Sequence, residues 1–167
     1  MITYRFVTNE DIPHIQSIAH DTWKFTYGNI YSKDYIHNFL SVAYSIENLS
    51  RSVERDLQSS KRKFLIAEYN NEMVGFAQTS QVDEEAYELT RIYIRPEYHK
   101  LGIGTGFIQE YVQVLAPIRQ LFAWVAKNND IGRGFYEKYG FKETEEKVEL
   151  IEGNTKKQIK YELELSM

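Results

Sequence analysis

The alternation of apolar and polar positions along the chain predicts a series of short strands. The expected strands cover residues 2–7, 64–69, 73–81, 87–94, 121–126, 148–151 and 158–165. Residues 64–69 and 73–81 flank the turn-forming sequence Asn70-Asn71-Glu72, which predicts a hairpin. Residues 148–151 and 158–165 flank a second turn, Glu152-Gly153-Asn154, at the end of the chain.

Apolar residues at helical spacing predict helices between these strands. The expected helices run from Thr8 to about His20, over 33–40, from 45 to about 58, from the glycine-rich stretch 99–106 to Pro117, and over 131–139. Ser45 is the expected cap of the third. Residues 21–31 are too irregular for a long helix, so their aromatic side chains predict a loop that lines a pocket. This order favours an α/β fold, a mixed sheet with helices on both faces.

Composition narrows the classes of protein that remain. A length of 167 residues, 43% hydrophobic and 26% charged, fits one globular domain over 1–167. The absence of cysteine excludes disulfides, thiolate metal sites and thiol nucleophiles. Neither a targeting signal nor a membrane span is expected, which favours a cytoplasmic protein. The net charge of −4 argues against nucleic acid as a partner.

The glycines between the strand at 87–94 and the following helix form a candidate anion site. Gly102 and Gly104 permit backbone conformations and close approaches that side chains would block. Unpaired N–H groups at a helix start, together with the helix dipole, suit a pyrophosphate without the need for many basic side chains. A tight turn that only serves packing is the alternative. The lysine and serine of a Walker loop and the third glycine of a dinucleotide fingerprint are missing.

Two segments resemble motifs of the GNAT acetyltransferases. The segment 89–105, LTRIYIRPEYHKLGIGT, is similar to the family's central strand and acetyl-CoA loop, which follows Gln/Arg-x-x-Gly-x-Gly/Ala. His99 departs from that pattern at its first position. The segment 129–141, with Asn129 and the run FYEKYGF, resembles the C-terminal motif, and the opening 9–13 is also similar. The resemblance covers nearly the whole chain and implies a GNAT fold, with a mostly antiparallel sheet of about seven strands.

The resemblance implies acetyl-CoA as the cofactor, with no metal. In the family the pantetheine arm lies between two splayed strands and pairs with backbone groups, here those of Ile92, Tyr93 and Ile94. Asn129 matches the asparagine that hydrogen-bonds this arm, although it also suits a turn. The expected loop contacts to CoA are His99, Lys100, Leu101, Gly102, Ile103, Gly104 and Thr105. At His99 the family's contact is largely through the backbone, and Lys100 is equally suited to solvent.

Acyl transfer to an amine requires a neutral amine, a polarised carbonyl and a proton for the departing thiolate. By its position in the C-terminal motif, Tyr136 is expected to donate that proton, or else only to position CoA. Glu88 matches the base of the histone-acetylating branch; a solvated glutamate is the alternative. Trp124 stands where the branch that acetylates ribosomal N-termini has its glutamate, which argues against that specificity.

The acceptor is expected to be a small cationic amine, because the chain is similar to bacterial polyamine-acetylating members. Trp23, Tyr27, Tyr31 and Glu88 are the expected substrate contacts, and the acidic link 83–85 would attract a cation. A protein lysine or N-terminal amine is the rival acceptor, and an acyl-CoA-binding sensor without turnover is the rival class. A homodimer is left open.

Overall fold

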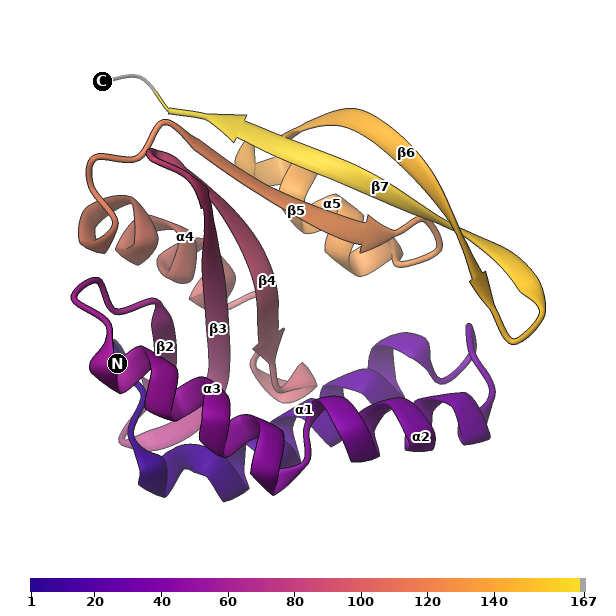
Figure 1. Ribbon diagram of the computed structural model, residues 1–167, viewed down its shortest axis with the longest axis horizontal. Helices are drawn as coiled ribbons and strands as arrows, with labels where there is room; N and C mark the ends of the chain where they lie inside the picture. Colours follow the sequence, from indigo (N-terminus) through magenta and orange to yellow (C-terminus); the bar gives the residue numbers. More distant parts are fainter. Residues whose placement is uncertain (166–167) are drawn as a thin grey trace. The chain divides into compact units, whose positions relative to one another are not determined.

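The computed structural model describes residues 1–165 (Figure 1). Within this range the chain divides into two compact units. Unit 1 contains Met1–Gln78 and Arg91–Leu115, and unit 2 contains Thr79–Thr90 and the segment from Ala116 onward. The expectation of a single domain over 1–167 stays a prediction.

Seven strands in the described residues form one mixed sheet, in the order β1-β2-β3-β4-β5-β7-β6. They are β1 (Ile2–Phe6), β2 (Phe64–Tyr69), β3 (Glu72–Asp83), β4 (Ala86–Ile94), β5 (Gln120–Ala126), β6 (Lys142–Ile151) and β7 (Asn154–Glu164). Strands β4 and β5 run parallel, whereas β1–β2, β2–β3, β5–β7 and β6–β7 are antiparallel. The predicted mixed, mostly antiparallel sheet is therefore confirmed.

Five α-helices accompany the sheet within residues 1–165. They are α1 (Ile12–Tyr27), α2 (Lys33–Ala43), α3 (Ile46–Gln58), α4 (Ile103–Val114) and α5 (Asp130–Tyr139), with short 3-10 turns η1 (Asn9–Asp11) and η2 (Pro96–Tyr98). None of these helices combines the length and apolar character that a membrane span requires. Helices α1, α2 and α3 pack against one another, whereas α4 packs on β1 and β2 (Figure 1).

The start of the first helical region follows the prediction at Thr8. The Thr8 backbone N–H donates to the Asp11 carboxylate at 2.8 Å, and the Arg5 guanidinium donates to both oxygens of that carboxylate at 2.8 Å each. Burial alone would raise the pKa of Asp11, but the bonds from Arg5 and Thr8 hold it below its ordinary value. A charged network therefore ties β1 to the start of α1.

Helix α1 is longer than the sequence predicts, so the interpretation of residues 21–31 as a loop is wrong for 21–27, whereas residues 28–31 lie in a turn after the helix. The helix continues to Tyr27 and Gly28 is its C-cap. Trp23 and Tyr27 are four positions apart, and their ring centroids lie 4.3 Å apart on one side of the helix. Packing between these rings therefore stabilises residues 21–27 as a helix, although their aromatic-rich sequence is typical of a loop. The prediction of Ser45 as a cap is confirmed, because its Oγ accepts from the Asn48 N–H at 3.1 Å.

Unit 2 is built on the long β6–β7 hairpin. Strand β6 begins at Lys142, although the apolar pattern predicts a strand only from Val148. Charged side chains occupy this extra length and pair across the strands: Glu145 lies 3.1 Å from Lys160, and Glu146 lies 3.4 Å from Lys157. Opposite charges on facing strands stabilise the pairing. Because this part of β6 lacks alternating apolar residues, the sequence pattern did not predict it.

Candidate functional site

The glycine turn before α4 leaves the helix start open. Lys100 and Gly102 both adopt left-handed backbone conformations, with φ of 68° and 82°. Gly102 is the N-cap, and among residues 1–165 no side chain caps this helix. The Gly106 N–H bonds the Gly102 carbonyl at 3.0 Å, so the three N–H groups before it lie outside the intrahelical ladder. Unpaired N–H groups at the positive end of a helix dipole suit an anion, so this turn keeps the features of the predicted anion site.

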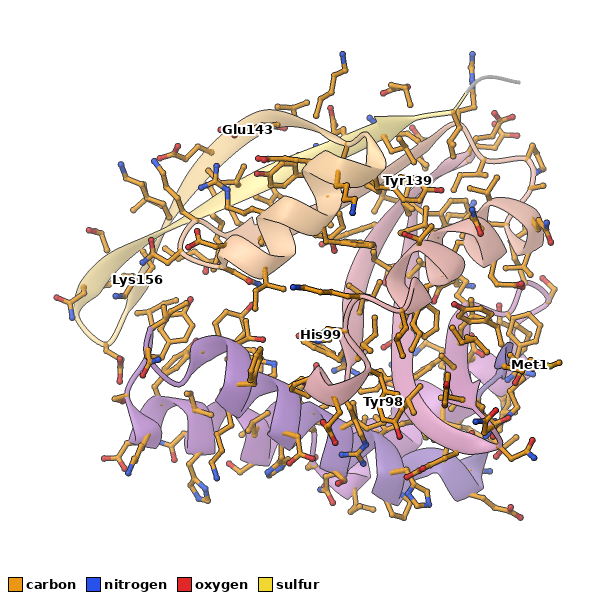
Figure 2. All side chains as sticks on the ribbon, turned by 180° about the vertical axis from the view of Figure 1, so that it is seen from behind. Met1, Tyr98, His99, Tyr139, Glu143 and Lys156 are labelled. Atoms are coloured by element: carbon orange, nitrogen blue, oxygen red, sulfur yellow. The ribbon has the colours of Figure 1, made fainter. Side chains whose placement is uncertain are left out.

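His99, which replaces the family's Gln or Arg, directs its side chain to its own loop. Its Nε2 lies 3.0 Å from the Ile94 carbonyl oxygen, and its ring meets the Phe25 ring edge-on at 5.7 Å. Figure 2 labels His99 beside Tyr98 on the segment between β4 and α4. The side chain thus joins the end of β4 and helix α1. Because the His99 side chain is engaged in these contacts, a ligand at this position would contact its backbone.

Unit 1 gathers eight aromatic rings, called here the aromatic set. Its members are Trp23, Tyr27, Tyr31, Tyr35, Phe39, Tyr44, Phe76 and Tyr93, each in ring contact with at least one other. The Trp23 indole N–H donates to the Tyr93 hydroxyl at 3.2 Å, which joins α1 to β4. The structure therefore brings together Trp23, Tyr27 and Tyr31, three of the residues expected to contact the amine substrate, and adds Tyr93 to them.

One ring of the aromatic set, Tyr44, has a cation of the protein itself over its face. The Arg91 guanidinium lies 4.6 Å above the Tyr44 ring centroid. It also donates to the Gln78 side chain at 3.2 Å and to the Ala43 carbonyl at 3.3 Å. Electron-rich ring faces attract ammonium and guanidinium groups, most strongly where water is excluded.

In unit 2, Tyr136 is surrounded by rings. It lies on α5 with 5% of its surface exposed, and its centroid is 5.1 Å from that of Phe141 and 5.8 Å from that of Tyr161. The Tyr161 hydroxyl donates to Glu137 at 2.6 Å and accepts from the Arg133 Nε at 2.9 Å. Burial raises the pKa of Tyr161. The Tyr161 side chain, whose ring stacks on Tyr136, is thus held by two residues of α5, Arg133 and Glu137.

Asn129 and Glu88 have local partners in unit 2. The Asn129 Oδ1 accepts from the Gly132 N–H at 2.9 Å, so its side chain caps α5. Glu88 is half-buried on β4 and stands opposite Phe122 of β5, the third of three register pairs in that parallel ladder. Beyond Phe122, β5 continues to Ala126 in register with β7. The cap matches the turn role considered for Asn129, and its contact with the pantetheine arm stays a prediction.

Two contacts near the predicted residues were not foreseen. Tyr161 stacks on Tyr136, and Tyr4 of β1 reaches the first turn of α4, where it crowds Gly106. Glycine costs about 1 kcal/mol in a helix interior, so Gly106 itself was a signal of a close approach. Tyr4 gives no such signal. Among residues 1–165 no group of acidic or histidine side chains is arranged to hold a metal ion.

Comparison with known proteins identifies the family. The sequence matches the acetyltransferase (GNAT) family over residues 26–141. It is 32% identical over 143 residues to spermidine N(1)-acetyltransferase of Thermoplasma acidophilum, covering 84% of this chain and 88% of that protein. It is 27% identical over 135 residues to the uncharacterised N-acetyltransferase YuaI of Bacillus subtilis, covering 77% and 74%.

Solved structures have the same fold. The crystal structure of the PaiA N-acetyltransferase of Thermoplasma acidophilum, in complex with coenzyme A, superposes with a TM-score of 0.81 at 29% identity, covering 99% of both chains. The ribosomal-protein-S18-alanine N-acetyltransferase of Escherichia coli superposes with a TM-score of 0.72 at 19% identity, covering 100% of this chain and 96% of that one, which supports the fold alone. The family match, the extended sequence identity and the shared fold agree: this chain belongs to the GNAT family of N-acetyltransferases.

Proposed function

We propose that this enzyme transfers the acetyl group of acetyl-CoA to a primary amine of a small cationic molecule, a polyamine being the foremost class. The identity with a spermidine acetyltransferase over most of both chains carries this proposal. The clustering of the expected contacts Trp23, Tyr27 and Tyr31 within the aromatic set supports it independently. The uncapped start of α4 supports CoA as the donor's carrier.

The proposed binding groups are backbone groups of unit 1. The N–H groups of Ile103, Gly104 and Thr105 would donate hydrogen bonds to the pyrophosphate oxygens. Lys100 would add a positive charge beside them, and the strand residues 92–94 would pair with the pantetheine arm. Because these contacts are to backbone and phosphate, an acidic protein needs few basic side chains to bind this anion.

The proposed chemistry uses two side chains of unit 2. Bound acetyl-CoA supplies a thioester, whose carbonyl carbon the neutral amine attacks in a ternary complex while the C–S bond breaks. Glu88 would accept the proton that the amine loses, through a water molecule. Tyr136 would donate a proton to the departing thiolate. The packing of the Tyr136 ring against Phe141 and Tyr161 supports a fixed orientation for its hydroxyl.

Two features support a cationic acceptor. A protonated amine gains about 0.5 to 2 kcal/mol on an aromatic face that it meets. Of the three expected ring contacts, Tyr27 is half-buried, whereas Trp23 and Tyr31 are buried, so Tyr27 is the ring that an amine would reach first. The acidic link before β4 adds negative potential: Asp83 and Glu84 are exposed, and Glu85 pairs with Arg119 at 3.7 Å. Such potential raises the local concentration of cations and weakens with salt.

Release of CoA from acetyl-CoA, measured with a panel of amines, tests this proposal. Polyamines should give the highest kcat/KM, with a KM that rises with salt, above amino acids, aminoglycosides and peptides with a free lysine or N-terminus. A preference for peptides would establish the rival acceptor. Acetyl-CoA binding without CoA release for any amine would instead indicate a sensor.

Glu88→Gln tests the base in the same assay. It should lower kcat most at low pH, where an amine of pKa near about 10 is hardest to deprotonate. An unchanged pH–rate profile would assign proton removal to bulk water or to another group.

A further inference from the structure

We propose that Tyr4 is a positioning residue for the CoA-binding turn of α4, acting through the Ile103–Gly104 peptide group. This inference rests on the proposed function, because it concerns the site where the pyrophosphate would bind. Its basis is a hydrogen bond from the Tyr4 hydroxyl to the Ile103 carbonyl oxygen, 2.8 Å long, between residues 99 positions apart.

The geometry of the peptide group explains how a hydrogen bond to the Ile103 carbonyl affects the N–H of Gly104. The Ile103 C=O and the Gly104 N–H belong to one planar unit and point in opposite directions. A donor held on the carbonyl therefore fixes the direction of the Gly104 N–H, one of the groups left outside the helical ladder. It also polarises that N–H, because hydrogen bonds in a chain strengthen one another. Tyr4 thus aims and strengthens a donor that it does not touch.

The residues around Tyr4 hold its ring against the first turns of α4. Its ring meets the Phe107 ring edge-on at 5.1 Å. A Cβ added to Gly106 would lie 1.8 Å from the Tyr4 hydroxyl oxygen and 2.4 Å from the ring carbon that bears it. Only glycine at position 106 therefore lets the phenol approach the helix. Glycine is unfavourable inside a helix, so its presence is explained by this approach.

The Tyr4 hydroxyl keeps its proton at any ordinary working pH. Burial, with a contribution from Glu110, raises the pKa of Tyr4 to about 12. The phenol therefore remains a hydrogen-bond donor to the carbonyl throughout the pH range of an amine acetyltransferase assay.

The same helix offers a matched control at its other end. The Tyr111 hydroxyl donates to the Lys63 carbonyl at 2.9 Å, and Tyr111 is fully buried. Tyr4→Phe and Tyr111→Phe each remove one phenol hydrogen bond from α4 and retain the ring. Only the first changes the peptide group that faces the anion.

Calorimetry with CoA, together with steady-state kinetics, compares the two variants with the wild type. Without the Tyr4 hydroxyl the Gly104 N–H is less well aimed and less polarised as a donor, so the Kd for CoA should rise about 5- to 10-fold in Tyr4→Phe. KM for acetyl-CoA should rise by the same factor, while kcat at saturation stays within about twofold. Tyr111→Phe should lower the melting temperature and leave the Kd for CoA within about twofold.

Gly106→Ala provides a second variant that displaces the phenol without removing it. It should also weaken CoA binding, and it should lower the melting temperature although alanine favours helices. Gly134→Ala in α5, where an added Cβ meets no atom within 4 Å, should not lower it.

The outcomes separate the two proposals. No binding of CoA by the wild type would overturn the proposed function and, with it, the role of Tyr4. Wild-type binding with an equal Kd in Tyr4→Phe, or equal losses in Tyr4→Phe and Tyr111→Phe, would overturn the positioning role and leave the proposed function intact.

Discussion

Helices α4 and α5 both begin close to predicted site residues, but they begin in different ways. The first turn of α4 follows left-handed Gly102, and no side chain in the described part of the chain caps it. The first turn of α5 is capped by Asn129, whose Oδ1 accepts from the Gly132 N–H. An N-terminus that its own sequence caps has fewer free donors for a ligand.

This difference indicates a division of labour between the two helices. Helix α4 offers backbone donors, so we expect it to determine the affinity for CoA. Helix α5 offers a side chain, Tyr136, so we expect it to determine the rate of the chemical step. Each of the following variants acts on one side of this comparison.

The largest effect is expected for Gly104→Val. Gly104 is buried in the first turn of α4, and in the proposed site a branched side chain here would occupy the space of the pyrophosphate. Binding of acetyl-CoA should fall by at least about 1000-fold, which is about 4.1 kcal/mol, when measured by calorimetry. Gly134→Val in α5 is the control and should retain binding. Unchanged affinity in Gly104→Val would show that the turn serves packing only.

An intermediate effect is expected for Tyr136→Phe. The substitution keeps the ring between Phe141 and Tyr161 and removes the hydroxyl. If that hydroxyl is the proton donor, kcat should fall about 10- to 1000-fold with little change in the Kd for CoA. Parallel losses in kcat and in affinity would assign Tyr136 to the positioning of CoA instead.

The smallest effect is expected at Asn129, where two substitutions distinguish a capping role from a contact with the pantetheine arm. Asn129→Ala removes the cap of α5 and should cost about 1 kcal/mol, which lowers the melting temperature by about 2 to 4 °C. Asn129→Asp keeps an oxygen acceptor for Gly132 and loses the amide donor, so stability should be retained. If KM for acetyl-CoA rises in Asn129→Asp, the amide also contacts the pantetheine arm; an unchanged KM restricts Asn129 to capping.

Local signals made much of the fold predictable. Ser45, the Asn70-Asn71 turn and the left-handed Gly140 each define an element end through their own backbone or side chain. The prediction failed where long-range partners decide. The extension of helix α1 to Tyr27 carries Trp23, whose ring stacks on Phe39 of α2 and whose N–H bonds the Tyr93 hydroxyl of β4. Strand β6 begins early because Glu145 and Glu146 meet lysines of β7.

The same distinction applies to the candidate site. The Gly102 turn was predictable because glycine adopts a left-handed backbone without steric cost. The contact of Tyr4 with Ile103 was not, because the two residues are 99 positions apart and a tyrosine in a strand has many packing roles. Likewise, Tyr161 belongs to the alternating pattern of β7, and nothing in that pattern indicates that its ring stacks on Tyr136.

The most direct test of the central claim is amide hydrogen exchange of the full chain, at single-residue resolution, with and without CoA. If CoA binds the uncapped start of α4, the Gly104 amide should gain protection by at least about tenfold more than the Gly132 amide, which Asn129 already bonds. Equal protection at the two positions, or protection of Gly132 alone, would contradict the assignment of the anion site to α4.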